Sequence, residues 1–138
     1  MPEKTALSPT ERLDIHELIS LYGHLIDQRQ FSRLGEIFTD DAVFDLRGYN
    51  GSCFQGLHAI QTMMRASDEH PLAHHATNVV VLAKADYIGA ISKGLGAGAG
   101  GRVGSVTYRD RLYLTPQGWR IQTRRCELRQ ADAIPEPT

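Results

Sequence analysis

VGSVTYRDRLYLTPQGWRIQTRRCEL, residues 103–128, holds two stretches of alternating side chains joined by a short turn. Residues 103–114 and 118–128 are predicted to form a hairpin, because residues 115–118 have the Pro and Gly of a tight turn. On the second strand, the residues that should face one side are Trp119, Ile121 and Thr123, and those that should face the other are Arg120, Gln122 and Arg124. Such alternation is typical of a strand with one dry and one wetter face. This end of the chain therefore predicts an antiparallel sheet.

Two more strands are expected before this hairpin. Residues 78–83 are β-branched and continuous, which is typical of a strand covered on both faces, and residues 87–91 form the second strand. The glycines of residues 96–101 match the pattern GxGxxG, but a strand rather than a helix follows them. In a dinucleotide site the pyrophosphate binds at the N-terminus of a helix that follows the glycines. Because no helix follows here, this stretch is interpreted as a hairpin loop and not as a dinucleotide site.

The N-terminal half of the chain shows helical patterns. Ser8, Pro9 and Glu11 predict a helix start with a capping box, and this helix should run to Asp27 or Gln28. Its apolar stripe consists of Ile15, Leu18, Ile19, Tyr22, Leu25 and Ile26. Shorter helices are predicted over residues 31–38 and from Gly56 to residues 68–71, on either side of a strand at residues 42–46 and its turn at residues 47–51.

The order of these elements predicts the fold class. Three helices interrupted by a small strand pair precede a four-strand antiparallel meander, and this arrangement defines an α+β domain. A curved sheet closed by helices leaves a concave interior, where a ligand would bind. The 138 residues fit a single domain, with a core at about residues 10–128 and a frayed tail at residues 131–138.

Charge and composition argue against several classes of partner. The net charge of −1 gives no electrostatic footprint for nucleic acid or an anionic membrane, and no apolar run approaches the ~20 residues of a membrane span. The N-terminal residues are polar and contain no signal segment, so a cytoplasmic protein is expected. Cys53 and Cys126 are expected to be free thiols, and no Cys or His spacing predicts a metal ion. No cofactor is expected.

His74 and His75 are the first candidates for chemistry. Because side chains alternate along a strand, one imidazole should face the interior and the other the outside, and alternation alone leaves open which one. An inward imidazole can act as a general base near neutral pH. The alternative is a histidine that only bonds a backbone group.

A histidine base needs a carboxylate that fixes its tautomer. Asp27 is the best candidate, although at ~100° per residue it falls ~140° from the middle of the apolar stripe, so helical periodicity does not send it inward. Tyr22 belongs to that stripe, and its hydroxyl could reach a cavity. One of Arg124 and Arg125 must face the concave side, where it would pair with Asp27 or bind an anionic group of a substrate.

Four segments together resemble a known family. They are LISLYGHLIDQRQFSRLGEIFTDDAVFD (residues 18–45), FQGLHAI (54–60), HHATN (74–78) and VTYRDRLYLTPQGWRIQTRR (106–125). From about residue 10 to residue 125, the chain resembles the SnoaL-like branch of the nuclear-transport-factor-2-like superfamily. The resemblance implies a cone-shaped, cystatin-like fold, in which three helices close a curved antiparallel sheet around an apolar pocket. This superfamily includes ketosteroid isomerases and scytalone dehydratase as well as non-catalytic proteins.

The resemblance also implies a catalytic pair. In the dehydratase members, an aspartate at the end of helix 1 acts with a histidine four residues before an Asn or Gly. These positions fall on Asp27 and on His74, four residues before Asn78, so the resemblance favours His74 over His75. Tyr22 matches a tyrosine of some dehydratase members. Gln30 replaces an acid that the family often has, and residues 92–96 lack the second histidine of scytalone dehydratase, so dehydration of scytalone itself is not expected.

The expected function is therefore that of a cofactor-independent lyase or isomerase acting on a small apolar, ring-containing molecule. Asp27 and His74 are the expected catalytic residues. The expected substrate-binding residues are Tyr22, His75, Asn78, Arg124 and Arg125. The alternative is a non-catalytic domain that binds a hydrophobic ligand or assembles with another protein. A homodimer through the sheet face is expected in either case.

Overall fold

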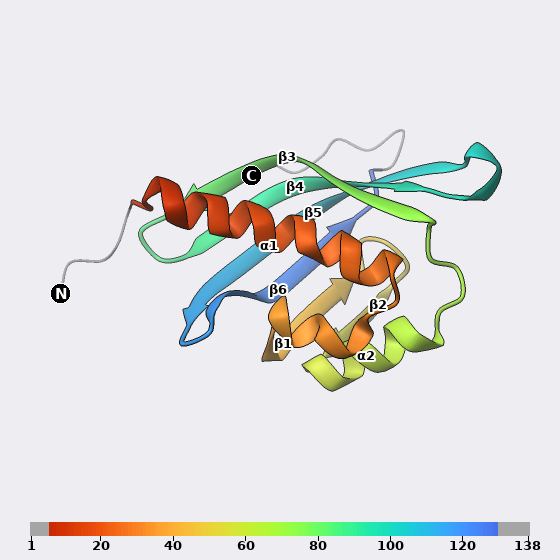
Figure 1. Cartoon of the computed structure of the whole chain (residues 1–138), viewed down its shortest axis with the longest axis horizontal. Coiled ribbons are helices and arrows are strands. Elements are labelled where there is room, and N and C mark those ends of the chain that lie inside the picture. Colours follow the sequence, from red (N-terminus) through yellow and green to blue (C-terminus); the bar gives the residue numbers. More distant parts are fainter. Residues whose placement is uncertain (1–5, 130–138) are drawn as a thin grey trace.

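A curved sheet of six strands, crossed on one face by a long helix, dominates the computed structural model, which describes residues 6–129 (Figure 1). The elements in chain order are α1 (Pro9–Asp27), η1 (Phe31–Glu36), β1 (Phe38–Leu46), β2 (Ser52–Gln55), α2 (Leu57–Ala66), β3 (Ala73–Ala83), β4 (Ile88–Ala97), η2 (Ala99–Gly101), β5 (Val103–Thr115) and β6 (Gly118–Glu127). The predicted α+β class is confirmed. The predicted frayed tail at residues 131–138 lies outside the described residues.

The strands lie in the order β2-β1-β6-β5-β4-β3. The sheet is mixed, not fully antiparallel as expected, because β6 returns along β1 in the parallel direction. The other neighbours are antiparallel, and β3 to β6 form the expected meander. The apolar stripe of α1 packs on the concave face, and α2 lies over β1 and β2 (Figure 1).

The start of α1 follows the predicted capping box. The Ser8 hydroxyl accepts from the Glu11 backbone N–H at 3.1 Å, and the Glu11 carboxylate accepts from the Ser8 backbone N–H at 3.1 Å. Because both bonds satisfy amides that the helix itself cannot pair, the helix begins at Pro9 and continues to Asp27.

The second predicted helix is shorter than its apolar pattern indicated. Residues 31–36 form a 3-10 helix, and the strand that follows starts at Phe38 rather than at residue 42. The cause is pairing with β6: the Ile121 backbone N–H donates to the Ile37 carbonyl at 2.7 Å, and Phe38 pairs with Ile121. These long-range contacts override the helical periodicity of the segment.

The strand that carries the two histidines also differs from the prediction. β3 begins at Ala73, five residues before the expected start, and it is an edge strand of the sheet rather than a strand covered on both faces. Val80 on this strand is 53% exposed. A β-branched run looks the same in sequence at an edge as in the centre of a sheet, so the pattern could not distinguish the two.

An extra residue in β6 changes which side chains face inward. Arg111 pairs with Thr123 and Leu112 pairs with Ile121, so Gln122 has no partner and forms a β-bulge. Strict alternation placed Thr123 on the dry face with Trp119 and Ile121, and this was wrong. Beyond the bulge, Arg124 and Cys126 are the buried residues.

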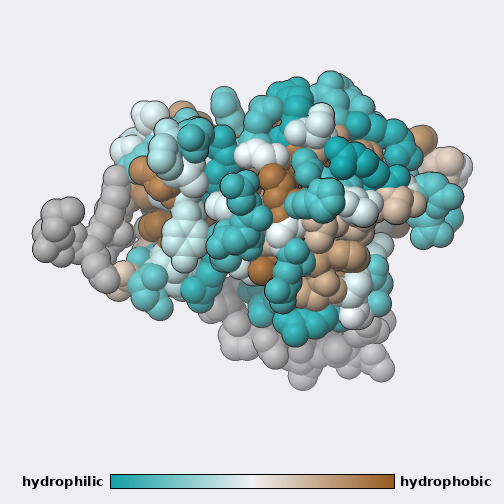
Figure 2. Space-filling model, turned by 90° about the horizontal axis from the view of Figure 1, so that it is seen from below, coloured by the Kyte–Doolittle hydropathy of each residue, from teal (hydrophilic) through white to brown (hydrophobic). Residues whose placement is uncertain are grey.

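The exterior of the described region is mainly hydrophilic in the view from below, and apolar surface occupies separate small areas (Figure 2). Within residues 6–129, no helix combines the length and the apolar character needed to cross a membrane.

Candidate active site

Asp27 and His74 meet where the end of α1 lies against the start of β3. The Asp27 carboxylate accepts a bond from the His74 ring nitrogen Nδ1 at 2.6 Å, and it also accepts from the His74 backbone N–H at 2.9 Å and 3.1 Å. The side chains are 16% exposed for His74 and 19% for Asp27. The carboxylate therefore fixes both the strand start and the imidazole ring.

The local backbone explains why Asp27 does not follow the helical wheel. Asp27 is the last residue of α1, and Arg29 has a φ of 55°, so the chain leaves the helix axis at once. One turn earlier, Gly23 lets β3 come close: a Cβ on Gly23 would lie 3.2 Å from the His74 Cβ and 3.3 Å from the His74 carbonyl oxygen. A larger residue there would push His74 away from Asp27.

The contact assigns roles to the two ring nitrogens of His74. A carboxylate only accepts hydrogen bonds, so Nδ1 carries the proton that is shared with Asp27. In a neutral imidazole the other nitrogen, Nε2, is then the acceptor. A histidine held in this way is arranged to take a proton through Nε2.

A buried ion pair lies next to the Asp27–His74 pair on the same concave face of the sheet. The Arg124 guanidinium donates from Nε and Nη2 to the Asp110 carboxylate at 2.8 Å and 2.9 Å, and both side chains are fully buried. The guanidinium carbon is 4.5 Å from the ring centroid of Tyr22 and 4.0 Å from that of Tyr108. Nη1 has no hydrogen-bond partner among the described residues.

Burial and charge set the protonation states of this cluster. Burial alone would lower the pKa of Arg124, but the Asp110 carboxylate more than offsets this and raises that pKa above its ordinary value. Burial raises the pKa of Tyr108 to about 12 and that of Tyr22 well above its ordinary value. At neutral pH the cluster therefore presents a charged guanidinium and two neutral phenols.

These groups share a small cavity. Its lining residues are Ile19, Tyr22, Gly23, His74, His75, Ala76, Gly94, Tyr108 and Arg124. Its volume is about 10 Å³, which is room for about one water molecule. Gly94 contributes because a Cβ there would overlap Cε2 of Tyr108, so only glycine admits this ring. The open apolar pocket that the resemblance implied is filled by aromatic side chains.

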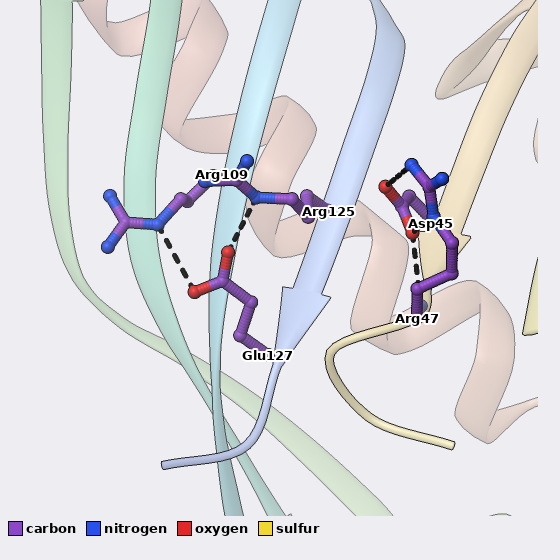
Figure 3. A network of polar contacts seen from close by, with 5 residues as sticks. All are labelled: Asp45, Arg47, Arg109, Arg125 and Glu127. Atoms are coloured by element: carbon purple, nitrogen blue, oxygen red, sulfur yellow. Dashed lines mark hydrogen bonds and ion pairs between the residues drawn. The ribbon is translucent and has the colours of Figure 1, made fainter. Parts of the chain in front are cut away.

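The remaining predicted site residues lie apart from this cavity or at its margin. His75 borders it but is exposed. Asn78 is exposed and has a φ of 55° at the bulge of β3, and it does not line the cavity. Arg125 lies on the opposite face of the sheet, where it pairs with Glu127 (Figure 3). Of the two candidate arginines, Arg124 faces inward, and its partner is Asp110 rather than Asp27.

The opposite face of the sheet carries its own polar network. Figure 3 shows Glu127 between Arg109 and Arg125, with the Asp45–Arg47 pair nearby on β1 and its turn. Exposed apolar side chains, Val80 and Tyr113, lie on the same face. The homodimer expected through this face stays a prediction, which sedimentation equilibrium would test.

Sequence reasoning missed Asp110 and Tyr108. Both alternate with Leu112 on β5, and cross-strand pairing of the hairpin places Asp110 opposite Arg124 and Tyr108 opposite Cys126. The predicted turn fixes the strand register near the tip of the hairpin. Beyond Gln122, however, the β-bulge shifts this register by one residue, so the turn alone does not give the partner of Arg124.

Within residues 6–129, no group of three or more His, Cys, Asp or Glu side chains could hold a metal ion.

Comparisons with known proteins agree with this architecture. An NTF2-like protein with a cystatin-like fold from Novosphingobium aromaticivorans is 24% identical, with a TM-score of 0.75 over 90% of this chain and 85% of that one. A single-residue variant of the Mycobacterium tuberculosis protein Rv3472 is 26% identical, with a TM-score of 0.75 over 87% of this chain and 77% of that one. The sheet and its helices thus define a cystatin-like, NTF2-like fold.

The sequence comparisons identify the family. Residues 8–125 match the family model of the SnoaL-like domain. Protein Rv2910c of Mycobacterium tuberculosis is 32% identical over 119 residues, which are 81% of this chain and 81% of that protein. The chain belongs to the SnoaL-like family.

Proposed function

We propose that the protein is a cofactor-independent lyase or isomerase, in which His74 takes a proton from a carbon atom of a small ring-containing molecule. The observation that carries the proposal is the 2.6 Å contact between His74 Nδ1 and Asp27 Oδ1, because it leaves Nε2 as the proton acceptor. Asp27 would orient the ring and stabilise the imidazolium that forms. Membership in the SnoaL-like family supports an activity of the isomerase or dehydratase type.

The neighbouring cation supports the same proposal. When a carbon next to a carbonyl loses a proton, negative charge develops on the carbonyl oxygen. Arg124 lines the same cavity as His74, and its Nη1 is left without a hydrogen-bond partner by the described residues. A fixed donor for such charge is typically worth ~3–4 kcal/mol in the transition state. Arg124 would supply it, with the hydroxyls of Tyr22 and Tyr108 as further donors.

The size of the cavity adds a requirement. A ring-containing substrate exceeds a volume of about 10 Å³, so side chains that line the cavity must move when the substrate enters. A non-catalytic ligand-binding domain would need the same opening. The two functions therefore differ in proton transfer rather than in access.

Proton transfer can be measured without knowledge of the natural substrate. A panel of cyclic ketones and cyclic β-hydroxy ketones is incubated with the protein in D2O, and exchange of the hydrogens next to the carbonyl is followed by NMR. At least one compound should exchange faster with the protein than without it. His74→Gln and Asp27→Asn should each slow this exchange by ~10²-fold or more.

His58→Gln is the matched control, because His58 is an exposed histidine on α2 that does not line the cavity. Its exchange rate should equal that of the wild type. Exchange that persists in His74→Gln would overturn the proposed base. Saturable binding of ring compounds with no exchange in any of them would instead support the non-catalytic alternative.

A further inference from the structure

A second concave site lies on the other side of α1 from the cavity of His74. It is a groove of about 730 Å³ between α1 and the tip of the β5–β6 hairpin. Its lining residues are Glu11, Asp14, Glu17, Leu18, Ser20, Leu21, His24, Glu36, Leu114, Gln117, Gly118, Trp119 and Arg120. None of them lines the cavity shared by His74 and Arg124, so the groove is separate from the candidate active site.

Apolar side chains form the base and one wall of the groove. Leu18 and Trp119 are buried beneath it, whereas Leu114 is 63% exposed on the hairpin. The hairpin tip is held in place, because the Thr115 hydroxyl donates to the Gly118 carbonyl at 2.8 Å and accepts from the Gln117 N–H at 3.2 Å. The apolar wall therefore stands on a fixed turn, opposite a helix.

The rim of the groove is negatively charged. Glu11, Asp14 and Glu17 follow at intervals of three residues along α1, and Glu36 adds a fourth carboxylate. Arg120 is the one guanidinium among the lining residues, and it donates to the backbone carbonyls of Gly35 and Trp119. Glu36 pairs with Arg33, but Asp14 and Glu17 form no ion pair with another described residue. Negative charge is thus concentrated beside an apolar surface.

We propose that this groove binds an organic cation, an ammonium group carried on an apolar aromatic or aliphatic body. The apolar body would lie on Leu18, Leu114 and Trp119, and the ammonium group would face Asp14 and Glu17. The volume falls within the range of roughly 300–1,000 Å³ that is usual for small-molecule sites, and the helix and the hairpin bound the groove on two sides. The volume favours a small molecule over a macromolecular partner, and the charge of the rim disfavours anions.

Trp119 allows a direct test, because it is the only tryptophan of the chain. Its fluorescence is followed during titration with 4-phenylbutylammonium, with the neutral 4-phenylbutanol and with the anionic 4-phenylbutyrate. The ammonium compound should give a saturable change, with an affinity at least about tenfold higher than that of the alcohol. The carboxylate should give none. This difference should shrink at high salt, because exposed charges are screened.

Two charge-matched variants make the test specific. The double variant Asp14→Asn/Glu17→Gln should reduce the affinity for 4-phenylbutylammonium to that for the alcohol. The control Glu69→Gln/Asp86→Asn removes the same charge at exposed positions outside the groove, and its affinity should match that of the wild type. Thermal unfolding of each variant checks that the fold is retained.

Three outcomes would overturn the inference. The first is equal binding of the ammonium compound and the alcohol, and the second is the same loss of affinity in both double variants. The third is a change in Trp119 fluorescence with a basic amphipathic peptide but not with 4-phenylbutylammonium, which would assign the groove to a protein partner. None of these results bears on proton transfer by His74, because the two sites share no lining residue.

Discussion

Arg124 and Asp110 form a bidentate ion pair between neighbouring strands, with neither side chain exposed to solvent. Removing one partner of a buried pair leaves an uncompensated charge, at a cost of ~3–5 kcal/mol. We expect Arg124→Met and Asp110→Leu each to lower the free energy of unfolding by about this amount, as measured by urea denaturation. The double variant should lose much less than the sum of the two, because both charges are then gone. Additive losses would show that the ion pair is not a coupled unit.

The assignment of the His74 tautomer can be tested by NMR. With Nδ1 held by the Asp27 carboxylate, the neutral ring should carry its proton on Nδ1, and the ¹⁵N shift of Nε2 should be that of an unprotonated nitrogen. In Asp27→Ala this preference should be lost. A proton on Nε2 in the wild-type protein would contradict the orientation that the proposed mechanism needs.

The two cysteines should differ in reactivity. Cys53 is exposed, whereas Cys126 is 5% exposed, and burial raises the pKa of its thiol to about 11. Because the thiolate is the reactive form, a thiol reagent at pH 8 should modify one group per native chain and two per denatured chain. In Cys53→Ser the native reaction should disappear. Rapid modification of both thiols in the native protein would mean that the interior around Arg124 opens readily.

The Asp45–Arg47 pair should make stability depend on pH in the acid range. Hydrogen bonds from Arg47 lower the pKa of Asp45 to about 2. This folded value lies below the unfolded value of ~3.9, so the pair stabilises the fold at higher pH and loses this contribution as the pH falls toward 2. Arg47 is 70% exposed, so the contribution should be only ~0.2–1 kcal/mol.

The measurement is thermal unfolding of wild type and Asp45→Asn from pH 2 to pH 7. The variant should melt at a lower temperature than the wild type at pH 7, and the two should converge near pH 2. A constant difference over the whole range would exclude titration of Asp45 as its cause.

The parts of the fold that were predictable depend on local chemistry. The capping box at Ser8 and Glu11 and the turn at residues 115–118 act through neighbours in sequence, and both appear in the structure as expected. The 3-10 turn at residues 31–36 and the early start of β1 were not predictable, because parallel pairing with β6 decides them.

The candidate site was predictable only in part, for a similar reason. The family resemblance proposed His74 and Asp27, whereas the helical wheel alone sent Asp27 outward. The side chain reaches His74 because the helix ends at that residue. The size of the cavity follows from how the rings of Tyr22 and Tyr108 pack around Arg124, and alternation in a sequence contains no such information.

The bulge at Gln122 has a consequence for reading related sequences. Because Gln122 is the unpaired residue, a chain that lacked it would alternate regularly from Ile121 to Arg124 and would still direct this arginine inward. Deletion of this one residue would therefore keep the arginine buried. Deletion of one residue elsewhere in the paired strands between Tyr108 and Arg124 would instead exchange the inward and outward side chains of one strand. Gains and losses of this arginine in evolution should be judged by strand pairing rather than by position in an alignment.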